Sequence, residues 1–250
     1  MRYRWLLFDA DGTLFDYDGA EASALERTLA GEGRATDAAA RAAYHRINAA
    51  LWKQLEGGTV DAATLRTRRF ELLFAELDIP CAAARTASER YLVELAACAR
   101  LLPGAEEVVR ELAASTRMAI VTNGLADVQR PRFARSSIAD LFELLTISDE
   151  LGIAKPDPRI LDVTLEALGS PPKDEVLMIG DSLTSDVQGG VNAGVDTCWL
   201  APNGDRPPEA PLPTWVIRSL AELPAIVSGA RGRAGAREGA ADPVPRVPEC

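Results

Sequence analysis

The chain has 250 residues, of which 47% are hydrophobic, and this suits one large globular domain or two smaller ones. Its formal net charge of −10 argues against a nucleic-acid polymer as a partner, because such polymers are bound through Lys and Arg. No run approaches the ~18 apolar residues of a membrane helix, so a membrane partner is not expected either.

The first predicted element is a short buried strand over residues 4–9. It ends in Asp9, and Asp11-Gly12-Thr13 follows after one residue. Side chains two positions apart along a strand point to the same side, so Asp9 and Asp11 are aimed at one place. Two such charges are unfavourable unless a cation lies between them or one carboxyl keeps its proton. The stretch is therefore either an acidic site or an ordinary acidic turn after a strand.

Residues 16–100 carry a helical pattern, in which we expect no strand. The segment is rich in alanine, and its apolar residues recur at spacings of three and four. Four helices are expected, at Leu25 to Leu29, Ile47 to Leu55, Leu65 to Leu77 and Tyr91 to Leu95. Glycines and Pro80 mark the loops between them.

After residue 101, short apolar runs alternate with helical spans. Strands are expected at 118–121, 144–147, 176–181 and 196–200, with an edge strand at 214–217. Helices are expected at 125–137, 158–169, 185–193 and 220–227, and another opens at Pro103-Gly104. This alternation predicts an α/β fold with a doubly wound parallel sheet.

The first strand belongs to the same sheet, so the helical block interrupts the core. We expect a core over residues 1–15 and 101–228 and a helical insertion over residues 16–100. Residues 229–250 contain mostly Gly, Ala, Arg and Pro and offer little that could build a core, which predicts a disordered tail.

Polar residues gather where the predicted strands end. In an open parallel sheet, ligands bind outside the carboxyl ends of the strands, so side chains at those ends can share one site. These residues are Asp9 and Asp11, Thr122 and Asn123, Lys155, and Asp181 with Asp186.

The carboxylates of this set could bind a divalent cation and react with a phosphate ester. Asp9, Asp181 and a backbone carbonyl form an all-oxygen set of the kind that binds Mg²⁺. Asp9 could then attack phosphorus to give an aspartyl-phosphate that water hydrolyses. Asp11 could protonate the leaving oxygen and afterwards deprotonate that water.

The remaining polar residues could hold the phosphate itself. The Thr122 side chain, the Asn123 backbone amide and the Lys155 ammonium could contact the equatorial oxygens, where charge lies in the transition state.

Four motifs in order resemble those of the haloacid-dehalogenase (HAD) superfamily phosphohydrolases: Phe8 to Thr13, Val121 to Gly124, Ala154 to Asp157 and Gly180 to Asp186. The resemblance implies a Rossmann-like core with the helical insertion as a cap. It also implies Asp9 as nucleophile, Asp11 as acid and base, and Thr122 and Lys155 as phosphate ligands. Magnesium would be bound by Asp9, the Asp11 carbonyl and Asp181. Asp186 would be either a water-mediated metal partner or a brace for Lys155. Dehalogenation is not expected, since that chemistry does not need Asp11.

A narrower resemblance covers nearly the whole predicted fold. Seven parts of the chain are similar to the noncanonical pyrimidine nucleotidases. They are Trp5, the first motif extended from Phe8 to Asp16, Leu51-Trp52, Arg68-Arg69-Phe70, Gly152 to Pro156, Gly189 to Trp199 and Pro213 to Trp215. That family dephosphorylates nucleoside 5′-monophosphates such as dUMP and dTMP. The resemblance implies a small phosphate ester as partner, and we expect either a monomer or a homodimer.

Two cap residues are candidates for contact with the substrate. Trp52 could stack on a base, although a cap tryptophan more often packs a core. Arg69, with Arg66 and Arg68, could reach the nucleotide, although a basic run on a helix is usually a solvated face. His45 shows no partner and is read as structural or exposed.

The four cysteines show no CxxC pair or metal-ligand spacing, which suits a reducing cytosol. The apolar run before Asp9 is too short for a secretion signal, so we expect a cytoplasmic protein. Two alternatives to a nucleotidase stay open. One is a phosphatase for sugar or carboxylate phosphates such as phosphoglycolate. The other is a non-catalytic phosphate-binding module, against which the joint presence of Asp9 and Asp11 speaks.

Overall fold

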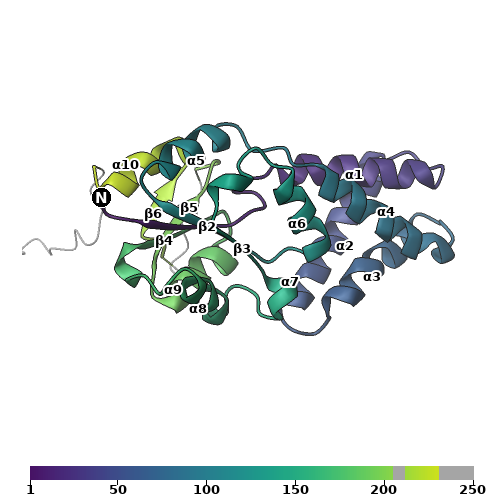
Figure 1. Cartoon of the computed structure of the whole chain (residues 1–250). Helices are drawn as coiled ribbons and strands as arrows, with labels where there is room; N and C mark the ends of the chain where they lie inside the picture. Colours follow the sequence, from purple (N-terminus) through teal and green to yellow (C-terminus); the bar gives the residue numbers. More distant parts are fainter. Residues whose placement is uncertain (205–211, 231–250) are drawn as a thin grey trace, which may run out of the picture.

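The computed structural model describes residues 1–204 and 212–230 of the chain (Figure 1). The tail expected over residues 229–250 therefore lies, from residue 231 onward, outside the described residues. Among the residues described, no helix is both long enough and apolar enough to span a membrane.

The core contains a sheet whose strands, within the described ranges, run parallel in the order β3-β2-β1-β4-β5-β6. They are β1 (Trp5–Phe8), β2 (Arg117–Thr122), β3 (Leu144–Ile147), β4 (Val176–Gly180), β5 (Asp196–Leu200) and β6 (Trp215–Ile217). Each expected strand is present, with 214–217 at the edge, so the predicted doubly wound parallel sheet is confirmed. The chain adds β2 and β3 on one side of β1 and then β4 on the other, and this reversal creates the crevice where such folds bind ligands.

Helices cover both faces of the sheet (Figure 1). One face carries α5 (Ala105–Ala113) and α10 (Leu223–Ser228), and the other carries α8 (Pro158–Ala167) and α9 (Gln188–Ala193). Along β1, Leu6 and Phe8 join the apolar cluster of the first face and Leu7 joins that of the second. A strand of a parallel sheet is buried on both faces, which is why its sequence is continuously apolar.

The expected cap is present as four helices at one end of the sheet (Figure 1). They are α1 (Tyr17–Gly31), α2 (Ala38–Glu56), α3 (Ala62–Glu76) and α4 (Ala84–Ala97). They pack around an apolar cluster of their own. Asp16, Asp37 and Asp61 cap the first three helices, since each side chain accepts a backbone N–H from the first turn.

The two segments that connect the cap to the core run side by side. The Asp16 N–H donates to the Arg100 carbonyl oxygen at 3.0 Å, and the Leu102 N–H donates to the Leu14 carbonyl oxygen at 2.9 Å. The side chains of Arg100 and Asp16 also form an ion pair of 2.6 Å. We therefore propose residues 16 and 100 as the limits of the cap.

Two helices differ from expectation. The helix expected over 185–193 begins as a π-helical turn, Leu183–Val187, before α9 starts at Gln188. Ser182 caps this turn by accepting the Ser185 N–H at 3.2 Å. Such turns are frequent at functional sites, and this one carries Asp186. The helix expected over 125–137 is shorter, α6 (Ala126–Ala134).

Gly189 and Gly190 provide a test of how closely α9 packs on the sheet. A Cβ at Gly190 would lie 2.4 Å from Cγ2 of the buried Thr197, whereas a Cβ at Gly189 would meet nothing closer than 3.5 Å. We expect Gly190→Ala to lower the free energy of unfolding by about 1–3 kcal/mol through overpacking. Gly189→Ala should raise it by up to about 1 kcal/mol, because alanine favours the helix. Urea denaturation of both variants measures this, and equal stabilities would contradict the close approach.

Candidate active site

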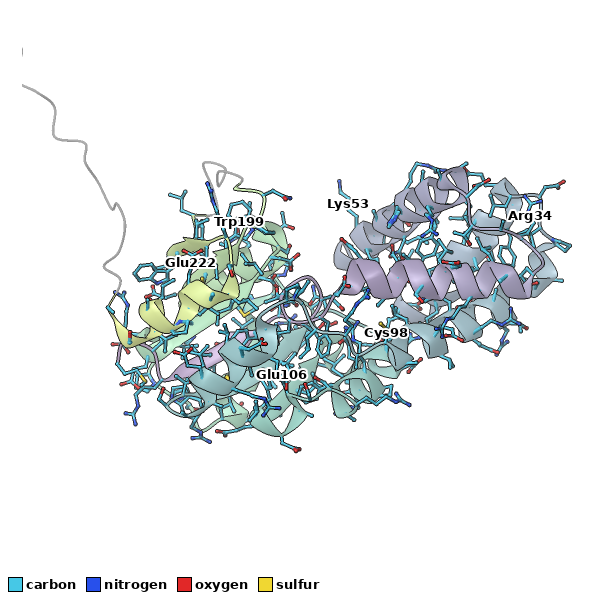
Figure 2. The ribbon with its side chains drawn as sticks, turned by 90° about the horizontal axis from the view of Figure 1, so that it is seen from above. Arg34, Lys53, Cys98, Glu106, Trp199 and Glu222 are labelled. Atoms are coloured by element: carbon cyan, nitrogen blue, oxygen red, sulfur yellow. The ribbon has the colours of Figure 1, made fainter. Side chains whose placement is uncertain are left out.

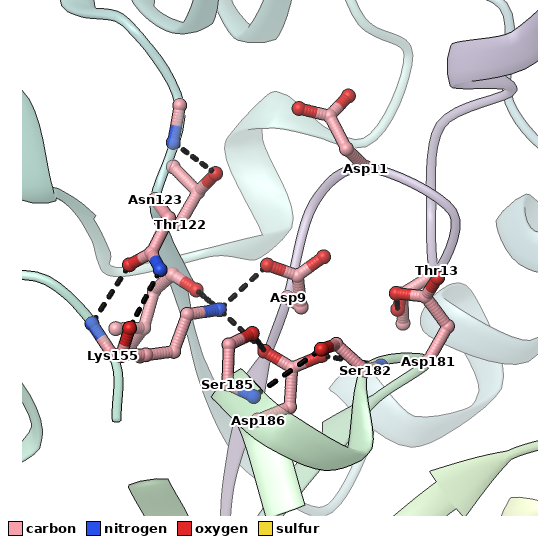
Figure 3. A network of polar contacts seen from close by, with 12 residues as sticks. Asp9, Asp11, Thr13, Thr122, Asn123, Lys155, Asp181, Ser182, Ser185 and Asp186 are labelled. Atoms are coloured by element: carbon pink, nitrogen blue, oxygen red, sulfur yellow. Dashed lines mark hydrogen bonds and ion pairs between the residues drawn. The ribbon is translucent and has the colours of Figure 1, made fainter. Parts of the chain in front are cut away.

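The expected polar residues meet at the carboxyl end of the sheet, on both sides of β1 (Figure 3). Asp9 follows β1, Thr122 ends β2, and Asp181 follows β4. Lys155 reaches the same place from the loop after the short helix α7 (Ser148–Leu151), and Asp186 from the π-helical turn.

The ammonium group of Lys155 is the centre of this arrangement. Its Nζ lies 2.6 Å from Oδ1 of Asp9, 2.7 Å from Oδ1 of Asp186 and 2.6 Å from the Val121 carbonyl oxygen. These contacts use all three donors of a lysine whose side chain has no exposed area. Burial favours the neutral amine, but the carboxylates of Asp186 and Asp9 outweigh it and raise the pKa of Lys155. Lys155 is therefore charged.

Asp186 contacts Lys155, as the brace role implied by the resemblance requires, and it also lies close to Asp9 and Asp181, so the metal-partner role stays open. Its Oδ1 accepts from the ammonium, and its Oδ2 accepts the Ser182 N–H at 2.9 Å. The residue is buried.

Asn123 holds the backbone of Lys155 by a reciprocal pair of hydrogen bonds. Its Nδ2 donates to the Lys155 carbonyl oxygen, and the Lys155 N–H donates to its Oδ1, both at 2.8 Å. The sequence suggested only a backbone role for Asn123. Its side chain joins the loop after α7 to the end of β2, and this contact sets where the ammonium lies.

Asp9, Asp181 and Asp186 form an acidic cluster. One carboxylate oxygen from each lies within 4.8 Å of the others. Burial raises the pKa of Asp9 well above its usual value, against the attraction of Lys155, and Asp186 and Asp181 raise it further. Burial, followed by Asp186, raises the pKa of Asp181 to about 6. Three carboxylates against one ammonium leave an excess of negative charge, so this all-oxygen set fits a hard divalent cation.

Asp11 is not part of that cluster. Its side chain points away from Asp9 (Figure 3) and contacts Gln129 and Arg132 of α6 instead. The ligand expected from Asp11 is its backbone carbonyl, so the predicted metal site does not need this side chain. The sequence analysis missed Gln129 and Arg132. The available sequence signal for these two residues was their spacing, since polar side chains three positions apart in a helix lie on one face. The structure shows that this face is buried.

A cavity of about 220 Å³ opens above these groups, between the core and the cap. The core contributes Asp9, Asp11, Thr122, Asn123 and Gly124 to its wall, and the cap contributes Tyr17, Asn48 and Trp52. A larger cleft of about 640 Å³ between cap and core is also lined by Trp52 and Asn123. In Figure 2 the core, with Glu106 and Glu222 labelled, lies on the left, and the cap, with Arg34 and Lys53 labelled, lies on the right.

The two cap candidates lie in different places. Trp52 lines the cavity, as a residue in contact with substrate would. Arg69 is 1% exposed, does not line the cavity, and stacks over the Tyr91 ring at 4.6 Å from its centroid. His45 is exposed, but its Nδ1 lies 2.8 Å from Oε1 of Glu21, a partner that the sequence did not reveal.

Comparison with known proteins agrees with this geometry. Residues 3–194 match the family model of the haloacid dehalogenase-like hydrolases. The chain is 35% identical to pyrimidine 5′-nucleotidase YjjG of Escherichia coli over 89% of this chain and 97% of that protein. It is 36% identical to pyrimidine 5′-nucleotidase PynA of Streptococcus pneumoniae over 89% and 94%. A magnesium-bound structure of the HAD-hydrolase YfnB from Bacillus subtilis superposes with a TM-score of 0.84, at 32% identity, over 91% of this chain and 99% of that one.

The charge excess predicts a pH-dependent stability of the metal-free protein. The pKa of Asp181 rises from 3.8 to about 6 on folding, so its ionisation destabilises the fold as pH rises through that interval. In EDTA at about pH 8, Asp181→Asn should therefore unfold at a higher temperature than the wild type, and below about pH 4 the difference should vanish. Asp162→Asn, which changes an exposed carboxylate on α8, is the control. Thermal unfolding at several pH values measures this, and an Asp181→Asn variant no more stable than wild type at pH 8 would contradict it.

Proposed function

Because the chain belongs to the haloacid dehalogenase-like hydrolases, we propose that it is a phosphatase that hydrolyses nucleoside 5′-monophosphates, with pyrimidine nucleotides as the preferred class. The observation that carries this proposal is the buried Asp9–Lys155–Asp186 network beside Asp181, which opens on a cavity between core and cap. The two nucleotidase relatives, which match nearly the whole length, support the choice of substrate class.

Asp9 is the proposed nucleophile. Lys155 holds its Oδ1, and the residue lines the cavity, so its carboxylate is oriented toward an incoming phosphate. Attack on phosphorus forms the Asp9–phosphoryl bond as the ester bond to the leaving oxygen breaks. Asp11, in its protonated form, gives its proton to that oxygen. The Asp11 carboxylate then takes a proton from water, whose oxygen displaces Asp9 and releases inorganic phosphate.

The proposed cofactor is Mg²⁺, and the residues that would hold it are Asp9, Asp181 and the backbone carbonyl of Asp11. The donor set fits, because the carboxylates of Asp9 and Asp181 lie together and the pKa of each is raised by burial and by neighbouring acids. When bound, the ion supplies positive charge that screens these carboxylates from the phosphate.

The proposed phosphate contacts are the Thr122 hydroxyl and the Asn123 backbone amide, and the proposed role of the Lys155 ammonium, whose three donors are already taken, is to place positive charge beside the phosphate. Thr122 and Asn123 line the cavity, and Lys155 lies directly behind Asp9. On the cap side, Trp52 is proposed to stack on the base. Arg69 lies buried behind the lining residues, so its effect on the substrate would pass through the packing of the cap.

Removal of the nucleophile is the direct test of the chemistry. Asp9→Asn should lower phosphate release by at least about 10³-fold, because amide nitrogen and oxygen cannot form the phosphoenzyme. Phosphate release by wild type should also stop in excess EDTA and should recover when Mg²⁺ is added in excess. Phosphate release by Asp9→Asn should not recover. Released phosphate is measured with a coupled assay, and thermal unfolding verifies that the variant is folded. Activity of a folded Asp9→Asn close to that of wild type would remove Asp9 as nucleophile.

A panel of phosphate esters tests the substrate class. We expect kcat/KM for dUMP and dTMP to exceed that for phosphoglycolate and sugar phosphates by about 10-fold or more, the scale of discrimination that a pocket wall provides. Trp52→Ala should reduce this ratio and leave the turnover of phosphoglycolate nearly unchanged. Equal or faster turnover of phosphoglycolate or a sugar phosphate by wild type would overturn the nucleotide assignment and favour the alternative phosphatase.

A further inference from the structure

The carboxylate of Asp11 is held by two side chains of α6. Nε2 of Gln129 donates to Oδ2 of Asp11 at 2.6 Å, and Nη2 of Arg132 donates to Oδ1. Arg132 Nη2 also donates to Oε1 of Gln129 at 2.8 Å, which closes a ring of three side chains. Both oxygens of Asp11 therefore have a fixed partner, although Asp11 lies on a loop more than 100 positions away in sequence.

The two residues that α6 contributes to this ring are buried, at a cost in stability. Gln129 is 2% exposed and Arg132 is fully buried. Nε and Nη1 of Arg132 have no hydrogen-bond partner among the described residues, and its guanidinium lies 4.8 Å from the centroid of the Phe15 ring. A buried cation with unpartnered N–H groups is expensive, and an apolar side chain would fill the space at lower cost. Packing alone does not account for Arg132.

The backbone near the phosphate residues makes room for Gln129. A Cβ at Gly124 would lie 2.1 Å from Nε2 of Gln129 and 2.7 Å from its Cγ. Any side chain at position 124 would therefore displace the Gln129 amide from Asp11. The glycine that follows Thr122-Asn123 is what allows the contact to form.

The position of Asp11 also suits the chemistry. In phosphoryl transfer the attacking and leaving oxygens lie in line on opposite sides of phosphorus. The acid that protonates the leaving oxygen therefore belongs across the phosphoryl group from the nucleophile. Asp11 lines the same cavity as Asp9. Its carboxylate points away from Asp9 (Figure 3) and contacts Gln129 of α6.

We propose that Gln129 and Arg132 are positioning residues, which hold the Asp11 carboxylate at the cavity wall where proton transfer to the leaving oxygen and from water takes place. Neither residue lines the cavity, so both act through Asp11. This inference rests on the proposed function, because it assigns Asp11 the acid–base role.

Variants of α6 test the proposal. Gln129→Leu removes the donor to Asp11 with little change in volume, and Arg132→Met removes the cation. Each should lower kcat for dUMP by about 10- to 100-fold, the loss expected for a misplaced catalytic group, with KM within about twofold of wild type. Arg132→Lys, which keeps the charge, should recover part of the loss. Arg130→Gln is the matched control, because Arg130 is an exposed residue of the same helix that pairs with Glu150.

A second readout separates positioning from a general structural defect. With p-nitrophenyl phosphate the leaving group needs no proton, so formation of the phosphoenzyme should persist in Gln129→Leu while attack by water is slowed. The variant should show a burst of p-nitrophenolate equal to the enzyme concentration, measured by stopped-flow absorbance. Wild type and Arg130→Gln should show no such burst.

The proposal is overturned if kcat of folded Gln129→Leu matches that of Arg130→Gln, or if its loss lies entirely in KM. If Arg132→Met does not fold, Gln129→Leu, which removes no charge, decides the result alone. A wild-type enzyme that does not hydrolyse nucleotides contradicts the proposed function. An active wild type with a normal Gln129→Leu contradicts only the positioning role.

Discussion

The buried ammonium of Lys155 is the interaction on which the rest of the site depends. It lies between the carboxylates of Asp9 and Asp186 and also donates to a carbonyl of β2, so it ties the ends of β1 and β2 to the π-helical turn after β4. Removing the cation from a buried ion pair typically destabilises the fold by about 3–5 kcal/mol. Without the Lys155 ammonium, neither Asp9 nor Asp186 could therefore stay ionised. Asn123, which follows β2, holds the Lys155 backbone by two hydrogen bonds and so fixes where the ammonium lies.

The topology of the sheet brings the acids together. Strand order reverses at β1, and the parallel register pairs Phe8 with Ile179, so the residues that follow β1 and β4 emerge side by side. Asp9 and Asp181 are therefore neighbours because of the fold, although most of the chain separates them. One ammonium cannot balance three acids, and the remaining negative charge is why this set of oxygens fits a divalent cation.

Helix α6 belongs to both halves of the molecule. Val128 of this helix and Leu125, which immediately precedes it, lie in the apolar cluster of the cap. Asp127 pairs with Arg66 of α3 at 3.1 Å. The same helix carries Gln129 and Arg132, which contact Asp11. The helix therefore links the packing of the cap to the loop after β1.

The sequence by itself determined the parallel sheet, the helical insertion and the set of polar residues at the strand ends. Local patterns carry this information, because strands and helices impose their own periodicity and because Asp9, Thr122 and Asp181 directly follow or end apolar runs. Only the tertiary structure decided that Asp186 contacts Lys155, that Asp11 turns to Gln129 and Arg132, and that Arg69 lies inside the cap. Those contacts join residues that are distant in sequence, and they depend on how helices and loops pack against one another, which no local spacing records.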